Sequence, residues 1–318
     1  MRWFLHRSGI ALLTILFASF AVFVSVHLLP GNPVQTLYGQ SGRIGPAELA
    51  KLSASLGLNK PLLVQYLNYL WHCAHGDFGT SLASGVSVGR TMFERLPVTL
   101  ELATLSMTFA LVVGCAGGVY AAISHGKASD YVINGASLAG LSLPNFWYGL
   151  MLIILFGVLL RWLPVGGFQP FLADPVLNFE GMVLPTITLG TPIAAIFMRQ
   201  MRSAMLESLQ ADYVRTARSK GLRRRQVVVR HAARNSLTAV ITITGLQLGA
   251  VISGVVVVER LFALPGFGAL LLDSVFARDY PVVEGVALLT AVAYVVINLG
   301  IDVLYSLVDP RVRAAGSA

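Results

Sequence analysis

Among the six histidines, two lie close together in the sequence. His72 and His75 are separated by three positions, whereas the other four are scattered. A zinc site needs at least three protein ligands, and this pair does not supply them. We therefore interpret the two residues as ordinary polar loop residues and expect no metal site.

Nucleotide chemistry would require a glycine-rich phosphate loop of the form G-x-x-x-x-G-K-[ST]. The only Gly-Lys pair, Gly126-Lys127, is followed by Ala128 and lacks the upstream glycine. We expect no catalytic residue and no cofactor in this chain, and any ATP hydrolysis linked to it must occur in another protein.

The two cysteines give little redox information. Cys73 lies in a polar segment, whereas Cys115 lies inside an apolar run. A disulfide between residues in such different surroundings is not expected.

The composition indicates a protein that folds in lipid. Hydrophobic residues make up 55% of the 318 residues and charged residues only 12%. A water-soluble domain could not bury this excess in one core. The formal charge of +8 would point to nucleic acid in a soluble protein, but here its distribution along the chain matters more.

Six apolar segments are long enough to be membrane-spanning helices. A helix that crosses the hydrocarbon layer needs about 20 apolar residues, because lipid offers no hydrogen-bond partner for exposed backbone groups. The predicted spans, none of which contains Asp, Glu, Lys or Arg, are Gly9 to Leu29, Leu102 to Ser124, Tyr131 to Leu160, Gly181 to Met198, Asn235 to Val258 and Gly285 to Ile301. We expect the fourth to extend to about Met201 and the sixth to Val308. Pro144 predicts a kink or break in the third.

The basic residues predict the orientation, because Lys and Arg accumulate on the cytoplasmic side of bacterial membranes. With the N-terminus inside, the cytoplasmic segments hold 15 of the 23 basic residues and 4 acidic residues, or 15 − 4 = +11. The opposite side holds 8 basic and 10 acidic residues, or −2. Both termini are therefore expected in the cytoplasm.

This topology divides the chain into three parts. Residues 1–97 would comprise the first transmembrane helix and an extracytoplasmic segment, with a helical stretch around Pro46 to Leu56. That segment is too long for a simple connector. It is either a surface for an external partner or a cap on the first two helices. Residues 98–308 would form a five-helix core, and residues 309–318 a short cytoplasmic tail.

The cytoplasmic segment between the fourth and fifth spans is the most informative. Within Met205 to Lys220, four apolar residues recur at steps of three and four and predict one amphipathic helix: Leu206, Leu209, Tyr213 and Ala217. Gly221 is a suitable C-terminal cap. Such a helix either lies on anionic lipid headgroups or docks in a groove of a soluble subunit.

Two long motifs carry a resemblance to a known family. The run from Asp212 to Leu222, DYVRTARSKGL, followed by RHAARN at 230–235, resembles the cytoplasmic loop of ABC importer permeases of the dipeptide and oligopeptide branch. The run VERLFALPGFG at 258–268, continuing to ARDYP at 277–281, resembles the outer loop between the last two helices of that branch. LLPGNP at 28–33 resembles the B-type permease.

The departures from the family pattern are small. Thr216 stands where the wider superfamily often has Ala, and Thr238-Ala239 lacks the proline that often follows Arg-Asn at the start of the fifth helix. They concern local helix geometry.

The resemblance implies an all-α integral membrane protein of the type I ABC importer permease fold, in the bacterial inner membrane. Its partners would be a homologous permease, two ATPase subunits or one fused ATPase chain that bind ATP and Mg²⁺, and an extracytoplasmic substrate-binding protein. Peptides are the implied cargo, although close relatives carry nickel, glutathione or other small solutes. The implied ATPase-coupling residues are Leu209, Asp212, Tyr213, Arg215, Thr216, Ala217, Arg218, Gly221 and Leu222.

Small and polar residues within the spans have separate interpretations. The pairs Gly114 and Gly118, and Gly245 and Gly249, have the small-xxx-small spacing of closely packed helices. Gln247 and Asn298 are candidates for lining the transport pathway, with helix packing as the alternative. Asp302, near the inner end of the sixth span, is expected to form an ion pair or to be hydrated.

Two other functions remain to be separated by experiment. An ion-coupled secondary transporter usually carries ionisable residues at the membrane midplane, and the predicted spans have almost none. A membrane scaffold or channel would not explain the cytoplasmic amphipathic segment.

Overall fold

The computed structural model describes the backbone of residues 2–28, 54 and 59–308, and the side chains of residues 9–28, 54 and 59–301. The regular elements among these residues are helices, apart from one isolated bridge between Thr80 and Ser87. The predicted helix at Pro46 to Leu56 falls almost wholly outside the described residues, as does most of the LLPGNP motif at 28–33.

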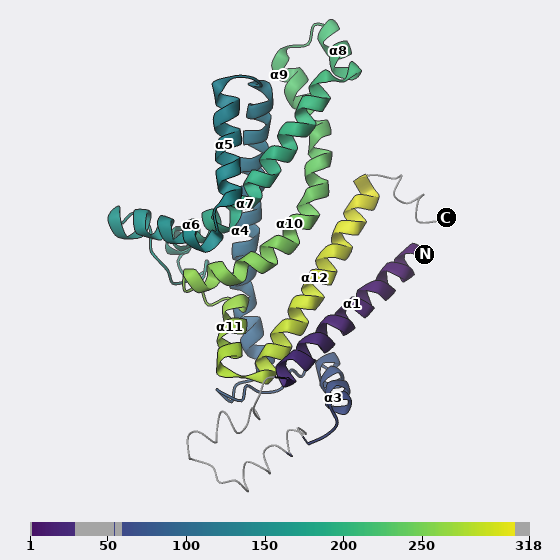
Figure 1. The fold of residues 1–318 in the computed structure, drawn as a ribbon, viewed down its shortest axis with the longest axis vertical. Helices are drawn as coiled ribbons and strands as arrows, with labels where there is room; N and C mark the ends of the chain where they lie inside the picture. Colours follow the sequence, from purple (N-terminus) through teal and green to yellow (C-terminus); the bar gives the residue numbers. More distant parts are fainter. Residues whose placement is uncertain (1, 29–53, 55–58, 309–318) are drawn as a thin grey trace. The chain divides into compact units, whose positions relative to one another are not determined.

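The described residues contain five helices that are long and apolar enough to cross a membrane, and one helix pair, bent at a break, that passes the same test only when its two parts are taken together (Figure 1). The five unbroken candidates lie in α1 (Arg2–His27), α4 (Val88–Ile123), α7 (Pro175–Gln210), α10 (Arg234–Leu261) and α12 (Tyr280–Val308). Their positions confirm five of the six predicted spans, and the bent pair covers the residues of the predicted third span. Most of the helices are longer than the apolar runs that predicted them.

The sixth candidate span is broken at Pro144, as its sequence predicts. Helix α5 (Ala128–Ser142) is followed by α6 (Asn145–Leu152) and the π-helix η2 (Ile153–Leu159), which turn away from it by 109°. Leu143 is extended, with φ −84° and ψ 129°, because the ring of the following proline disfavours the helical conformation.

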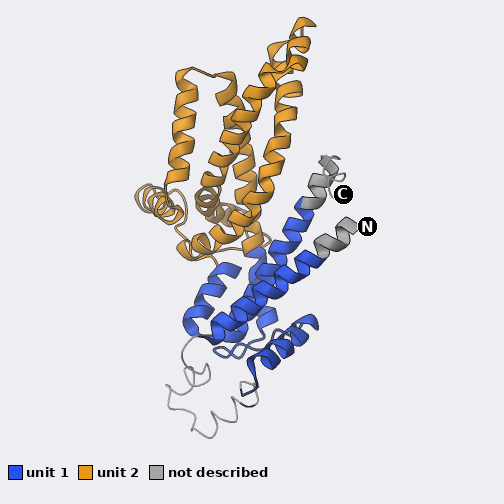
Figure 2. Cartoon of the chain, turned by 45° about the vertical axis from the view of Figure 1, so that its right-hand side comes forward, with its two compact units in different colours: residues 1–98, 265–318 blue, residues 99–264 orange. Residues whose placement is uncertain are grey.

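The chain forms two compact units, residues 1–98 with 265–318 and residues 99–264 (Figure 2). In the first unit α1 lies beside α12. Its core includes six buried apolar residues from the start of α4, from α11 (Phe267–Ala277) and from α12: Val88, Met92, Phe267, Leu270, Val282 and Val286. Residues 88–97 were expected to lie before the second membrane-spanning helix. In the structure they form the first turns of α4, and Pro97 lies within this helix.

Helix α3 (Leu62–Ala74) belongs to the same unit and packs on α1 through Tyr66, whose hydroxyl is 2.8 Å from Ser19 Oγ. His72 lies in this helix and not in a loop as predicted. Its Nδ1 is 2.7 Å from the carbonyl oxygen of Asn68.

In the second unit, α7 packs against α5, α6 and α10, and α4 and α5 form a hairpin through the turn at 124–127. Helix α4 approaches α7 closely at two glycines. A Cβ atom on Gly114 would lie 2.7 Å from the carbonyl oxygen of Ala194, and one on Gly118 would lie 2.6 Å from that of Met198. Only glycine allows the two backbones to come this near.

Candidate functional site: the segment between α7 and α10

A short helix, α8 (Asp212–Ser219), follows the end of α7 and lies at the tip of the second unit (Figure 1). The single helix predicted for Met205 to Lys220 is therefore wrong. Ala211 is extended, with φ −69° and ψ 150°, and separates Leu209 at the end of α7 from the residues of α8.

The inner face of α8 is fixed to the bundle by apolar packing. Val214 and Ala217 form a buried cluster with Val227, the first residue of the π-helix η3 (Val227–Ala233). Each of these three side chains is at most 6% exposed. Because α8 turns away after Ala211, Val214 and Ala217 can face Val227.

Two polar contacts reinforce this attachment. The Asn235 side-chain amide lies 3.3 Å from the Tyr213 hydroxyl, to which it donates a hydrogen bond. Ser236 Oγ on α10 lies 3.1 Å from Ser208 Oγ on α7. The start of α10 is thus hydrogen-bonded both to α8 and to the end of α7, which precedes α8.

The C-terminal end of α8 has the geometry predicted from Gly221. This residue has φ +77°, a left-handed conformation that glycine adopts without a side-chain clash. Its backbone N–H donates to the Arg218 carbonyl oxygen at 3.0 Å, and the N–H of Lys220 donates to that of Thr216 at 3.2 Å. The chain then turns through α9 (Arg224–Gln226) into η3.

The outer face of α8 and the turn after it is exposed and basic. Tyr213 is 41% exposed and Leu222 38%, and both are apolar groups at the surface of this chain. Residues 212–225 contain six basic and one acidic residue, or 6 − 1 = +5. The exposed polar residues of the predicted coupling set are Asp212, Arg215, Thr216 and Arg218.

The structure separates the predicted coupling residues into two groups. Tyr213, Arg215, Arg218 and Leu222 face outward, whereas Ala217 packs inside the segment. Sequence periodicity did not identify Val214 and Val227 as the residues that hold α8, because their contact depends on the break at Ala211.

The other predicted residues lie within the spans. Gly245 is buried and Gly249 half-buried on α10, which packs against α7. The side-chain oxygen of Gln247 is buried and has no hydrogen-bond partner among the described residues. Asn298 Nδ2 donates to the carbonyl oxygen of Tyr294 at 2.9 Å. The side chain of Asp302 is outside the described residues.

The second sequence motif contains a polar contact that its pattern did not predict. Asp279, 3% exposed, accepts hydrogen bonds from Ser81 Oγ at 2.5 Å and from the backbone N–H of Leu82 at 3.0 Å. It thereby joins the turn at 81–84 to the start of α12.

Comparisons with known proteins cover both halves of the chain. Residues 114–314 match the family "Binding-protein-dependent transport system inner membrane component", and residues 1–103 match the N-terminal family of the same membrane components. The chain is 40% identical to the dipeptide transport system permease protein DppB of Escherichia coli (strain K12), covering 98% of this chain and 99% of the relative. It is also 40% identical to the di/tripeptide transport system permease protein DppB of Pseudomonas aeruginosa (strain UCBPP-PA14), covering 97% of both proteins.

Proposed function

The chain belongs to the family of binding-protein-dependent transport system inner membrane components, and we propose that it forms one half of the translocation pathway of a peptide importer. Such a transport system includes a binding protein and ATPase partners. A homologous permease would form the other half of the translocation pathway. Two ATPase subunits, or one fused ATPase chain, bind on the cytoplasmic side, and the binding protein delivers cargo from the opposite side.

Peptides are the proposed cargo. Both relatives named above are described as permeases for dipeptides or for di- and tripeptides, and each aligns with nearly the whole chain. Nickel, glutathione and other small solutes are the alternatives that the family resemblance leaves open. Gln247 is proposed to line the pathway, because a buried amide oxygen without a protein partner is suited to a hydrated cavity. Asn298 is proposed for the same role from its polarity within α12.

The cytoplasmic contact with the ATPases is assigned to the outer face of α8. The observation that supports this proposal is the two-sided character of the helix. Its inner side is joined to the bundle through Val214, Ala217 and Val227, while Tyr213 and Leu222 leave apolar surface exposed beside a group of arginines. An element held on one side and exposed on the other can transmit a force from a partner to the membrane helices.

Alternating access follows from this attachment. Closure of the ATP-bound ATPases would displace α8, and the displacement would pass through α7 and η3 to the spans. Arg215 and Arg218 would supply polar contacts and Tyr213 and Leu222 apolar contacts. Ala217 would act indirectly by keeping α8 in place, since its side chain is buried in this chain.

The proposal is tested by reconstituting the complete transporter in proteoliposomes and measuring dipeptide uptake with and without ATP. Arg218→Glu should abolish ATP-dependent uptake and weaken copurification of the ATPases. Lys60→Glu, the same charge reversal at an exposed residue of the segment expected on the opposite side of the membrane, should leave the copurification of the ATPases unchanged.

A photocrosslinker placed at Leu222 identifies what covers α8. We expect it to capture an ATPase subunit in the assembled complex. Capture of lipid alone, together with normal uptake by the Arg218→Glu variant, would refute the assigned contact.

A further inference from the structure

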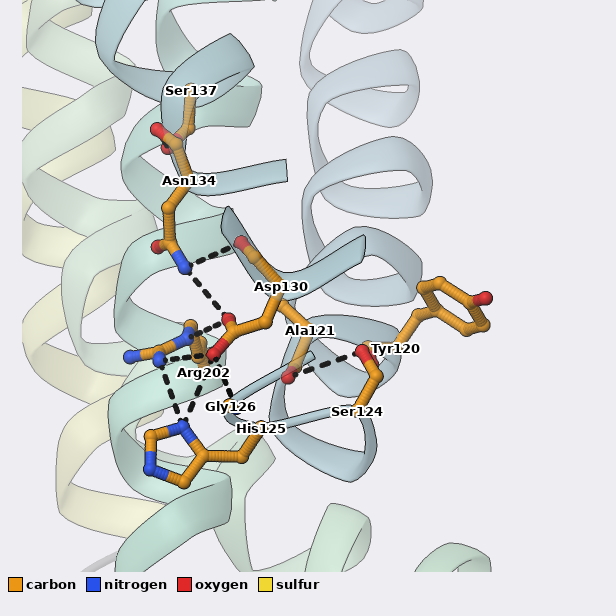
Figure 3. A network of polar contacts seen from close by, with 9 residues as sticks. All are labelled: Tyr120, Ala121, Ser124, His125, Gly126, Asp130, Asn134, Ser137 and Arg202. Carbon is orange, nitrogen blue, oxygen red and sulfur yellow. Dashed lines mark hydrogen bonds and ion pairs between the residues drawn. The ribbon is translucent and has the colours of Figure 1, made fainter. Parts of the chain in front are cut away.

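A buried carboxylate lies at the turn between α4 and α5, on the second unit (Figure 3). Asp130, in the first turn of α5, is only 3% exposed. Its two oxygens accept hydrogen bonds from the guanidinium of Arg202 on α7, at 2.8 Å from Nε and 2.9 Å from Nη2. This two-point contact fixes direction as well as distance between the two side chains.

Other polar groups complete the surroundings of Asp130. Asn134 Nδ2 lies 2.7 Å from Oδ1, and the backbone N–H of Gly126 lies 3.1 Å from Oδ2. His125 Nδ1 is also 3.1 Å from Oδ2. Figure 3 shows these groups converging on the carboxylate from the turn, from α5 and from α7. The buried negative charge of Asp130 is therefore compensated by the guanidinium of Arg202 and by further hydrogen bonds, so that the carboxylate can be buried without a large desolvation cost.

The position of Arg202 connects this site to α8. Arg202 lies on α7, which ends at Gln210, immediately before the break that leads into α8. On the other side of α8, Arg224 Nη2 donates to the carbonyl oxygen of Ile123, the last residue of α4, at 3.2 Å. The chain segments that enter and leave α8 both contact the α4–α5 hairpin, at Asp130 and at Ile123.

Close backbone packing supports the same connection. A Cβ atom on Gly118 of α4 would lie 2.7 Å from Met201 Cβ and 3.0 Å from the backbone nitrogen of Arg202. The end of α4 and the second half of α7 are thus in contact directly beside the ion pair. Sliding of α7 along the α4–α5 hairpin would have to break the two-point contact between Arg202 on α7 and Asp130 on α5.

We propose that Asp130 and Arg202 are positioning residues for transport, which make the α4–α5 hairpin move together with α7 and α8. The inference rests on the proposed role of α8 as the ATPase contact. Through the ion pair, a displacement of α8 reaches two further membrane helices and not only α7 and α10. Without it, ATP hydrolysis continues while α4 and α5 no longer follow α7.

The first test measures whether the hairpin and α7 move as one body. Spin labels are attached at Lys127→Cys, on the turn, and at Glu207→Cys, on α7, in the full transporter with Cys73 and Cys115 replaced by serine. Both labelled positions are exposed. Electron paramagnetic resonance gives the distance between the labels without nucleotide and with ATP trapped by vanadate. The same distance distribution is expected in both states, and a shift between them would overturn the proposal.

The second test separates coupling from folding. Asp130→Asn and Arg202→Gln should retain copurifying ATPases and ATP hydrolysis, but dipeptide uptake per ATP should fall roughly tenfold, within the range of typical coupling free energies. In Asp130→Asn the label distances should differ between the two nucleotide states. Arg202→Lys keeps the charge without the two-point geometry, and partial uptake is expected.

The matched control is Arg90→Gln, which removes an ion pair with Glu94 whose side chains are 75% and 61% exposed. Uptake per ATP should remain unchanged. Normal uptake per ATP in Asp130→Asn and Arg202→Gln would overturn the proposal. If these variants fail to assemble, a shift of the label distance between the nucleotide states of the protein with the intact ion pair would still overturn the proposal, and the Arg202→Lys variant, which keeps the charge, provides the test of the two-point contact. Failure of the α8 assignment is distinct, because it appears as normal uptake by Arg218→Glu.

Discussion

The glycines of α4 illustrate how single residues set the distance between helices. Gly118 faces the backbone of α7, and an added Cβ atom would lie 2.6 Å from the carbonyl oxygen of Met198. Since a backbone atom cannot move aside as a side chain can, Gly118→Ala should force α4 and α7 apart. We expect a loss of about 1–3 kcal/mol in the free energy of unfolding.

Gly135 of α5 provides the matched control, because a Cβ atom there would meet no other atom within 4 Å. Gly135→Ala should leave stability unchanged or raise it by up to about 1 kcal/mol through higher helix propensity. Thermal unfolding of the two variants in detergent distinguishes the effects. Equal midpoints would show that the close approach at Gly118 does not matter for stability.

The thiol of Cys73 offers a test based on pH. Burial raises the pKa of Cys73 to about 11, against a smaller opposing effect of its hydrogen bond with Tyr69. Only the thiolate reacts with maleimides, and an ordinary thiol, with a pKa of about 8.5, is mostly thiolate at about pH 10. In a Cys115→Ser background, the labelling rate of Cys73 should keep rising between about pH 9 and about pH 10.5. A rate that rises by about twofold or less between about pH 9 and about pH 10.5 would show an unshifted pKa.

At the scale of elements, the end of α8 depends on the left-handed conformation of Gly221. Proline fixes φ near −65° and has no N–H to donate to the Arg218 carbonyl oxygen, so Gly221→Pro should displace the turn after α8. Asparagine adopts the left-handed conformation more readily than other non-glycine residues, and Gly221→Asn should retain uptake. Uptake per ATP in proteoliposomes measures the difference. Normal uptake by the proline variant would contradict the prediction.

The turn at 81–84 depends on Asp279 of the first unit. Asp279→Ala would remove the acceptor of Ser81 and of the backbone N–H of Leu82, at a cost of about 1.5–3 kcal/mol for each hydrogen bond to the charged group. We expect faster proteolysis within residues 75–87. Asp77→Ala, which removes a single exposed contact to the N–H of Gly79, should have little effect. Equal cleavage rates would show that Asp279 does not hold the turn.

The long apolar helices followed from the sequence, but the shorter helices and the ends of elements often did not. Apolar runs located the five unbroken candidate spans and the bent pair, and Pro144 located the break, because proline restricts the residue before it regardless of the fold. The angle of 109° at that break depends on packing and could not be predicted. The end of α7 at Ala211 has no proline or glycine to announce it. It is explained by the contact of Val214 and Ala217 with Val227, because Val227 lies beyond the stretch that carries the periodic pattern.

The candidate site was predictable to a similar degree. The motif with Gly221 located the cytoplasmic segment, whereas the ion pair of Asp130 and Arg202 joins residues 72 positions apart. No local sequence pattern predicts such a pair. An arginine next to a cytoplasmic segment looks the same in the sequence whether its side chain pairs with a carboxylate or binds lipid headgroups. Only the packing of α5 on α7 brings the two side chains together.

For the whole molecule, the uneven distribution of charge predicts one orientation in the membrane. Of the 23 basic residues, 15 belong to the segments assigned to the cytoplasm, including Lys127 and Lys220. Lys60 belongs to the segment assigned to the opposite side. Because positive charge is retained on the cytoplasmic side during insertion, these three exposed positions should differ in accessibility.

Single cysteines at these positions, in a chain with Cys73 and Cys115 replaced by serine, measure the orientation directly. A membrane-impermeant maleimide applied to intact spheroplasts should label Lys60→Cys and leave Lys127→Cys and Lys220→Cys unlabelled. In inside-out vesicles the pattern should reverse, because the cytoplasmic face is then exposed to the reagent. Labelling of Lys220→Cys in intact spheroplasts would place α8 on the side away from ATP, and no ATPase could then act on it.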